Sequence, residues 1–461
     1  MNKIYLLILA IILIPSCAPN RINTKKERKH INYFSEERIN KSISRYNTSD
    51  GPEYQNKKLN FHDQTLSLDK AISVALEHNN SLQADLESLG IAKADLIQAG
   101  LLSNPYFETE YKIPRPQCKN EHAKVELHLS FTLSDLWQIP RRKKVAQDEL
   151  EITSIRIVNS IIDIFSRTKI AYYSSIYASD QEHLAERILH ESKKLEDRYS
   201  YRQQLGYSSE LDTNLAHVMV QHWLIEVNQS KNTVYASFRD LENILGIEIS
   251  NQPIILENII DIQSFEMPTL KELEQYAIEN RPELQMTRLR IQKAADLIKY
   301  EQSQFIPSVE LGLAYEREID KKKLAGPMLN ISLPIFDTNY AQVARARAQK
   351  KQFEQEYRTV LRTTLTEVKQ LYNKFNVMKD SIKKYNAMIP SFNDALSYVK
   401  KHMKNMQFTM LTFYQTQIAY YQEQQNALNA QLELLTTLAQ LEKAIGKQLF
   451  SIPKYDNKTE S

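Results

Sequence analysis

The chain has 461 residues, and 59 Lys and Arg against 56 Asp and Glu give it a formal net charge of +3. The charges are scattered along the chain, which excludes the basic footprint of a nucleic-acid-binding protein. No internal apolar run reaches the roughly 18 residues of a transmembrane helix, and no phosphate loop, paired metal ligands or nucleophile motif indicates an enzyme. We therefore expect no catalytic residue, no cofactor and no bound metal.

The N-terminus has the pattern of a secretory signal: a basic Lys3, an apolar run over residues 4–14, and then Ser16 before Cys17. A small residue followed by Cys resembles the bacterial lipobox, in which the peptide is cut before a lipidated thiol. We expect residues 1–16 to be a lipoprotein signal peptide and Cys17 to carry the acyl chains, palmitate among them, that anchor the protein. A plain signal peptide with an incidental Cys is the alternative.

Residues 17–65 are rich in Lys, Arg, Asn and Ser and show no clear period, so we expect an extended tether. Ala18 and Pro19 follow the cysteine where an inner-membrane retention Asp would stand, which by resemblance favours sorting to the outer membrane. Cys118 is then the one cysteine left, and it can form no internal disulfide.

The first half of the chain predicts a short helix, two strands and two long helices. Alternating apolar and polar residues indicate the strands, and the apolar residues of the helices recur at threes and fours. Because the long segments contain no Gly and almost no Pro, each predicts one helix, with Gly206 as the turn between them. The predicted elements are a helix over 68–99, strands over 105–111 and 125–133, and long helices over 141–205 and 207–246.

The same order returns about 200 residues further on, which indicates a duplicated unit. Pro105 and Gly246, for example, are matched by Pro307 and Gly446. The predicted parts are a first repeat over 66–260, a second repeat over 261–446 and a tail over 447–461. The predicted elements of the second repeat are a helix over 270–304, strands over 308–315 and 328–335, and long helices over 338–405 and 408–446.

Each predicted strand has one apolar and one polar face. Leu127 and Leu129 alternate with Glu126 and His128, for instance. An antiparallel sheet with its apolar face on a helix gives this pattern, and so does a transmembrane sheet with lipid on one side and a wet lumen on the other. In the second case the lumen-facing residues are Glu108, Glu110, Glu126, His128, Glu310 and Asn330.

Four strands cannot close a barrel, and an open sheet edge is not tolerated in lipid. Strands that span would therefore have to come from several subunits that share one barrel.

These features together resemble the TolC-like outer membrane efflux proteins. The resemblance covers roughly residues 66–446 and rests on the segment from Leu66 to Tyr111, its copy ending QFIPSVELGLAY, and YSSELDTNLA with its terminal ENILG. It implies a mostly helical fold with a small β part, a homotrimer with a 12-stranded outer-membrane barrel, and a periplasmic α-helical barrel. It also implies an exit duct that docks a periplasmic adaptor protein and an inner-membrane pump of the RND or ABC type.

By the same resemblance, the periplasmic aperture lies at the tips of the long helices. Relatives place acidic residues at the equivalents of Thr412 and Gln415, and this chain lacks both acids. Glu210 and Asp212 remain as candidates for a negative ring, although Asp212 could equally cap its helix. The candidate aperture residues are Gly206, Ser209, Glu210, Asp212, Met406, Phe408, Thr412 and Gln415.

Met403, Met406 and Met410 lie on one face of a predicted helix, and such a stripe indicates packing more often than a metal site.

Two functions remain open. One is the trimeric export duct of an outer membrane, and the other is a lipid-anchored periplasmic coiled-coil scaffold without a pore. The apolar face of the strands discriminates between them, because a soluble sheet would cover it with helix.

Overall fold

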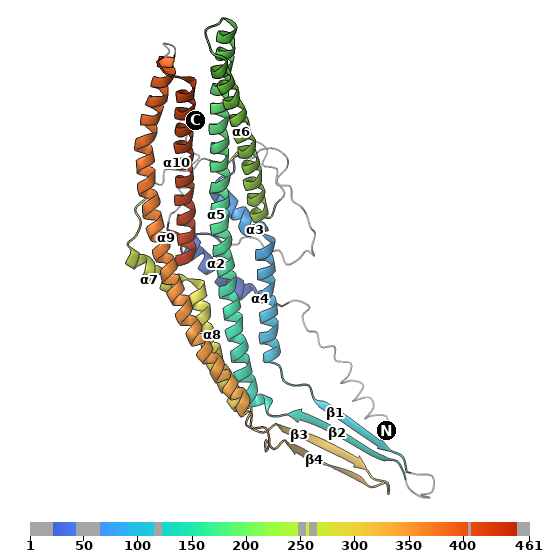
Figure 1. The fold of residues 1–461 in the computed structure, drawn as a ribbon. Coiled ribbons are helices and arrows are strands. Elements are labelled where there is room, and N and C mark those ends of the chain that lie inside the picture. The colour runs from blue at the N-terminus through green and yellow to red at the C-terminus, as the bar shows by residue number, and fades with distance from the viewer. Residues whose placement is uncertain are drawn as a thin grey trace, which may run out of the picture. The chain divides into compact units, whose positions relative to one another are not determined.

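The computed structural model describes residues 22–42, 65–114, 122–247, 255–257, 265–403 and 407–449. Within these residues most of the chain is helical and one small sheet is present, so the predicted mostly helical fold with a small β part is confirmed (Figure 1). No helix in this part of the chain is long and apolar enough to cross a membrane. The elements are α2 (Lys25–Ile39), α3 (Leu68–His78), α4 (Asn80–Ala99), β1 (Tyr106–Lys112), β2 (Lys124–Thr132), α5 (Asp135–Gln204), α6 (Glu210–Leu245), α7 (Leu270–Asn280), α8 (Pro282–Ser303), β3 (Val309–Arg317), β4 (Lys323–Ile331), α9 (Tyr340–His402) and α10 (Met410–Ile445).

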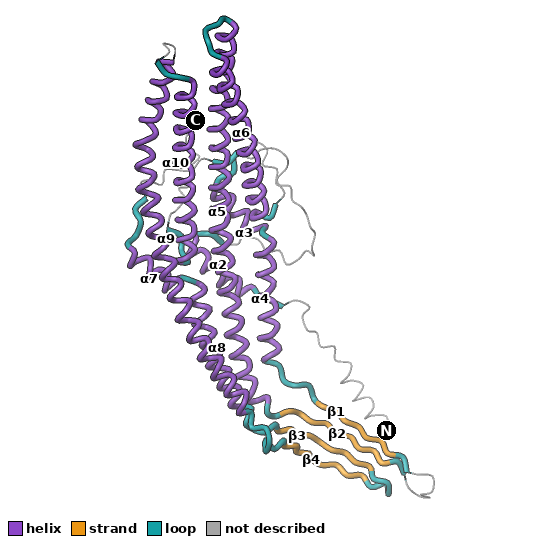
Figure 2. Tube along the Cα trace, viewed as in Figure 1, coloured by secondary structure: helices purple, strands orange, loops and turns teal. Residues whose placement is uncertain are grey.

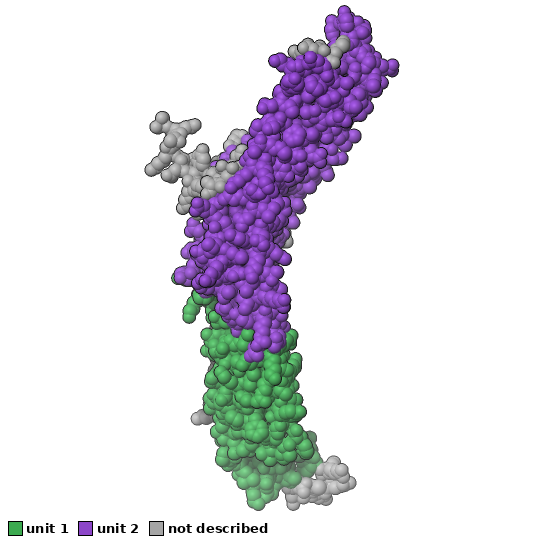
Figure 3. Space-filling model, turned by 60° about the vertical axis from the view of Figure 1, so that its left-hand side comes forward, with its two compact units in different colours: residues 1–30, 86–154, 289–352 green, residues 31–85, 155–288, 353–461 purple. Residues whose placement is uncertain are grey.

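The chain divides into two compact units, which Figure 3 colours separately. The first unit contains residues 1–30, 86–154 and 289–352 and holds the sheet. The second contains residues 31–85, 155–288 and 353–461 and holds the helical tips.

In the first unit, the sheet is an antiparallel meander with strand order β1-β2-β3-β4 (Figure 2). Glu108 pairs with His128, and His128 pairs with Ala314 on the next strand. Side chains of neighbouring strands in such a register point to the same face. The alternation seen in each strand therefore adds up to one polar face and one apolar face for the whole sheet.

The fourth strand lies earlier in the chain than predicted. β4 starts at Lys323, not at residue 328, and ends at Ile331. A tight turn fixes this register: the N–H of Glu318 bonds to the carbonyl oxygen of Lys322 at 2.9 Å, and Lys321 adopts a positive φ of 74°. Pro334, which has no N–H for a ladder, lies beyond the end of the strand.

In the second unit, one core lies near the tips and another near the ends of α7 and α10. The first core joins α5, α6, α9 and α10 through buried residues that include Ile188, Trp223 and Phe413. The second core joins α7, α9 and α10 through Leu273 and Val368, among others. The contacts within these two cores are the apolar seams that the spacing of three and four residues predicted.

Both short helices of the repeats are broken where the sequence predicts one continuous helix. The segment predicted as 68–99 forms α3 and α4 with Asn79 between them, and the segment predicted as 270–304 forms α7 and α8 with Arg281 between them. Asn79 and Arg281 have extended backbones with ψ of 116° and 118°. No Gly or Pro marks the break at Asn79, so the pattern of apolar residues gave no sign of it. Pro282 follows the break at Arg281 as the first residue of α8.

The prediction of an extended tether is wrong for residues 25–39, which form α2. Ile31, Ser35 and Ile39 recur every four residues and bury one side of this helix. At the other end of the chain, the N–H of Gln448 donates to the carbonyl oxygen of Arg38 at 2.8 Å. The predicted signal peptide, Cys17, Cys118 and Met406 lie outside the described residues.

Two prolines lie inside the long helices. α5 begins at Asp135, six residues before the predicted start, and includes Pro140. Pro390 lies inside α9. Each removes one main-chain hydrogen bond without ending the helix, which the rest of a long, packed helix tolerates.

Candidate functional site

The apolar face of the sheet is open in the single chain. Phe107, Leu129 and Leu313 form one row across three strands, and their exposed fractions are 53%, 37% and 66%. Leu311 and Leu329 form a neighbouring pair with exposed fractions of 46% and 59%. A soluble sheet would bury such a face against a helix. The exposed rows instead suit contact with an apolar medium or another chain.

The opposite face of the sheet carries all six predicted lumen residues. Glu108 pairs with His128, and Glu110 with Glu126. The third pair, Glu310 with Asn330, lies further along the same face. The sequence pattern thus placed these residues on one surface, although they come from four separate strands.

Three charged residues of this face were missed. Glu316 continues the row of Glu110 and Glu126, because β3 extends to Arg317 and not only to Tyr315. Lys124 forms ion pairs with Glu126, at 2.7 Å, and with Glu316. Lys112 pairs with Glu110 at 2.9 Å. Continuing the alternation by two residues at each strand end would have found all three.

Like charges directly opposite one another destabilise a sheet. The row of three glutamates is therefore held by the two lysines, which neutralise part of its charge. The polar face keeps five glutamates against these two lysines on the described strands, and its excess charge is negative.

The tip of the first repeat is the turn between α5 and α6. Gly206 has a φ of 75°, and the N–H of Tyr207 donates to the carbonyl oxygen of Arg202 at 2.8 Å. This arrangement ends a helix with a left-handed residue, a role that glycine takes most easily. Ser209 then caps α6 by accepting from the N–H of Asp212 at 3.1 Å.

Asp212 lies three residues after this cap and accepts a hydrogen bond from the Ser209 hydroxyl at 2.7 Å. Its carboxylate also lies close to Tyr199, whose pKa is raised by burial and further by the charge of Asp212. Asp212 thus stabilises the first turn of α6 locally. Glu210, in the same turn, is exposed.

The tip of the second repeat has the same geometry with uncharged residues. Thr409 caps α10 by accepting from the N–H of Thr412 at 3.2 Å, and the two hydroxyls lie 3.0 Å apart. Gln415 is exposed, whereas Phe408 is half-buried against Tyr398 with ring centroids 6.0 Å apart. The remaining two methionines of the stripe, Met403 and Met410, are buried members of the core near the tips. Their described contacts are those of packing.

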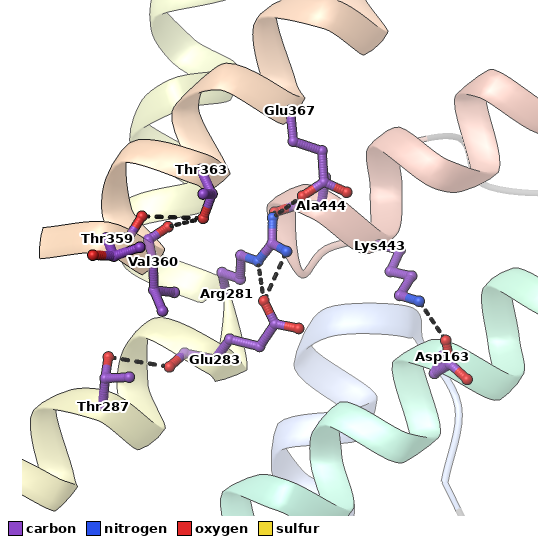
Figure 4. A network of polar contacts seen from close by, with 10 residues as sticks. All are labelled: Asp163, Arg281, Glu283, Thr287, Thr359, Val360, Thr363, Glu367, Lys443 and Ala444. Atoms are coloured by element: carbon purple, nitrogen blue, oxygen red, sulfur yellow. Dashed lines mark hydrogen bonds and ion pairs between the residues drawn. The ribbon is translucent and has the colours of Figure 1, made fainter. Parts of the chain in front are cut away.

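Each repeat also has a joint where the end of its last long helix meets the break in its short helix. In the second repeat, Gly446 caps α10 with a φ of 70° and lies directly against Asn280 and Arg281. Arg281 donates to Ala444 at 3.3 Å and forms ion pairs with Glu283 at 2.7 Å and Glu367 at 2.6 Å (Figure 4). The guanidinium thereby ties α8, α9 and α10 together.

In the first repeat, Gly246 caps α6 with a φ of 68° and lies against His78 and Asn79. The side chain of Asn79 donates to the carbonyl oxygen of Ile244 at 2.9 Å and accepts from the N–H of Leu82 at 3.1 Å. The joint therefore has the same backbone contact in both repeats, with an amide in one and a guanidinium in the other.

Comparison with known proteins agrees with this architecture. Residues 273–447 match the family model described as outer membrane efflux protein. The cobalt-zinc-cadmium resistance protein CzcC of Cupriavidus metallidurans is 21% identical over 293 residues, which cover 63% of this chain and 68% of that protein.

Solved structures share the fold at low sequence identity. CusC superposes with a TM-score of 0.72 at 16% identity, covering 82% of this chain and 92% of that one. The Campylobacter jejuni CmeC outer membrane channel superposes with a TM-score of 0.72 at 16% identity, covering 84% and 87%. The Neisseria gonorrhoeae MtrE outer membrane channel, in its open state, gives 0.68 at 18% identity, covering 83% and 89%.

The chain therefore shares the fold of these solved channels. Residues 273–447 are thus similar to the outer membrane efflux proteins.

Proposed function

We propose that this protein is the exit duct of a tripartite efflux or secretion system in the outer membrane. A periplasmic adaptor and an inner-membrane pump of the RND or ABC type would deliver the substrate, and the duct would conduct it passively. Cys17 would hold the acyl chains that add a lipid anchor. The observation that carries the proposal is the sheet, with an exposed apolar face on one side and a charged face on the other.

The edges of this sheet support a homotrimer. Among the residues that the structure describes, β1 and β4 each have one strand neighbour. Their outer N–H and C=O groups would be unpaired in lipid, which costs several kcal/mol per group. Three chains that share twelve strands would pair both edges.

The test uses two adjacent residues that point to opposite faces of β3. Leu313→Lys places a charge on the proposed lipid face, where it costs about 2–4 kcal/mol at the bilayer midplane. Ala314→Lys places the same charge on the proposed lumen face. We expect the first variant to lose trimers in detergent and the second to keep them, with trimers measured as mass corrected for bound detergent. Monomers of the unaltered protein in mild detergent, or equal effects of both variants, would argue against the duct.

The negative lumen face also favours cations as the conducted class of ion. Five glutamates against two lysines in each chain would attract cations into the pore. The curated relative CzcC is named a cobalt-zinc-cadmium resistance protein. In planar bilayers under a KCl gradient, we expect a cation-selective reversal potential that Glu316→Gln reduces. At the aperture, where Glu210 and Asp212 would supply negative charge, Asp212→Asn should reduce it as well. A reversal potential of the opposite sign would contradict this assignment.

A further inference from the structure

Two carboxyl groups are deeply buried in the first unit, outside the sheet and the tips. Asp148 belongs to α5 of the first repeat and is 1% exposed, and Asp296 belongs to α8 of the second repeat and is 6% exposed. Carboxylates this deeply buried need a partner for each oxygen, because an unpaired buried charge is costly.

Three of the four carboxyl oxygens have a hydrogen-bond donor. Lys144 donates to Oδ1 of Asp148 at 2.9 Å, and Lys299 donates to Oδ1 of Asp296 at 2.8 Å. Gln292 donates to Oδ2 of Asp296 at 2.9 Å. The fourth oxygen, Oδ2 of Asp148, is buried without a donor. Each of the two carboxyl groups shifts the pKa of the other, as neighbouring carboxyl groups do. A proton between the two groups would supply the bond that is lacking.

Two carboxyl groups in such contact cannot both ionise easily, so they titrate as a pair. Burial raises the pKa of Asp148. Burial would also raise the pKa of Asp296, but the hydrogen bonds from Lys299 and Gln292 outweigh it and hold that pKa below its ordinary value. A shared proton would therefore stay on Asp148, and its O–H would donate to the ionised Asp296.

We propose that Asp148 and Asp296 share one proton and are joined by it in acid. We call this hydrogen bond between the two carboxyl groups the latch, because it links α5 to α8 and so the two repeats. The other groups that act on the pair are Lys144 on α5, with Glu151 acting on Lys144, and Gln292 and Lys299 on α8. A second link between the same helices, the ion pair of Lys293 with Glu149 at 2.7 Å, contains no shared proton. It would persist when the latch opens.

The sign of the pH dependence follows from the two shifts. The raised pKa of Asp148 means that its stabilising proton is fully bound below the ordinary Asp value of 3.8 and is lost as the pH rises through the raised pKa. The lowered pKa of Asp296 means that its contribution is present above 3.8 and is lost only as the pH falls through the lowered pKa. The latch is therefore strongest in mild acid and opens as the pH rises.

The test is the thermal unfolding midpoint of the full-length, detergent-solubilised protein across mildly acid to alkaline pH. Asp148→Asn keeps a hydrogen-bond donor toward Asp296 but cannot ionise. We expect its midpoint to lose the decline that the unaltered protein shows with rising pH, so that the variant is higher by roughly 2–4 °C on the alkaline side. Asp95→Asn, which removes the same charge from an exposed position on α4, is the matched control and should follow the unaltered protein.

Infrared spectroscopy provides a second readout that does not depend on the variant folding. The unaltered protein should show the carbonyl band of a buried protonated carboxyl group, which persists to higher pH than an exposed Asp allows. Asp148→Asn should remove the band, and Asp95→Asn should keep it. Absence of the band in mild acid, or parallel midpoints of Asp148→Asn and the unaltered protein, would overturn the latch. A calcium- or magnesium-dependent rise of the midpoint that Asp148→Asn abolishes would also overturn it, because the pair would then hold a cation.

Discussion

The joints of the two repeats solve one packing problem with different chemistry. In the first repeat, the amide of Asn79 reaches the last turn of α6 and caps α4. In the second, the guanidinium of Arg281 reaches the last turn of α10 and adds two ion pairs. The glycine against which each break packs is the shared part. The backbone contact thus fixes the geometry of the joint. The polar side chain determines the stability of the joint and how much salt reduces that stability.

The largest expected effect comes from breaking the shared backbone contact. In Gly446→Ala the new Cβ would lie 2.6 Å from the carbonyl oxygen of Asn280, at a residue with a φ of 70°. We expect a loss of roughly 2–5 kcal/mol in the free energy of unfolding, from the left-handed backbone and the overlap together. Gly246→Ala should cost a similar amount against His78, as measured by denaturant unfolding of the detergent-solubilised protein.

Gly206→Ala is the control for this pair of variants. Its φ is 75°, but no atom lies within 4 Å of the added Cβ. It should cost roughly 1–2 kcal/mol, the backbone part alone. If all three substitutions lower the free energy of unfolding by the same amount, the close approach at the joints contributes nothing to the effect of the substitutions.

The second comparison measures how much each polar side chain of the joints contributes to the free energy of unfolding. Arg281→Ala should cost roughly 1–3 kcal/mol, because it removes two ion pairs of a mostly buried guanidinium and leaves Ala444 without its donor. Asn79→Ala should cost roughly 1–2 kcal/mol for a lost helix cap and one hydrogen bond. Repeating both measurements at high salt should reduce the first loss and leave the second unchanged, because salt screens charges. Equal salt dependence of the two losses would contradict the contrast.

The smallest expected effect concerns an ion pair near the tips that joins the two repeats. Its acidic residue belongs to the first repeat. Glu191 on α5 pairs with Lys400 on α9 at 2.7 Å and with Lys194 at 3.1 Å. The hydrogen bond from Lys400, followed by that from Lys194, lowers the pKa of Glu191 to about 2. Its stabilisation is therefore present above the ordinary value of 4.5 and is lost as the pH falls toward about 2.

Because these side chains are well exposed, solvent screening limits the bridge to about 0.5 kcal/mol. Glu191→Gln should remove that much stability at neutral pH and nothing at the acid end of this range, in pH-dependent thermal unfolding. A loss that persists unchanged in acid would show that charge is not the reason.

Local patterns were sufficient to predict the strands and the long helices, because alternation and the lack of Gly are properties of consecutive residues. The position of β4 depended on a turn at Glu318 and Lys322 and on pairing with β3, neither of which is a local pattern. The break at Asn79 depends on Gly246, which caps the end of another helix, α6. Sequence reasoning could therefore find the elements but not the joints between them.

The same distinction applies to the candidate site. The six polar residues of the sheet were found because period-two alternation survives in each strand. The glutamate row with Glu316 and the bridging Lys124 was not found, because a row across strands exists only after the register is set. At the tips, the duplicated cap residues Ser209 and Thr409 were visible in sequence, whereas the effect of the Asp212 charge on the pKa of Tyr199 was not.

The hydrogen bond between Gln448 and Arg38 has a consequence for the rate of folding. It joins α2 to the segment after α10 and connects residues about 400 positions apart in the sequence. Contacts between such distant residues slow folding, because the entropy of closing the loop is lost before the contact forms. We therefore expect α2 to dock late, after the helices of both repeats have paired, so that protection of its amide hydrogens appears last in refolding.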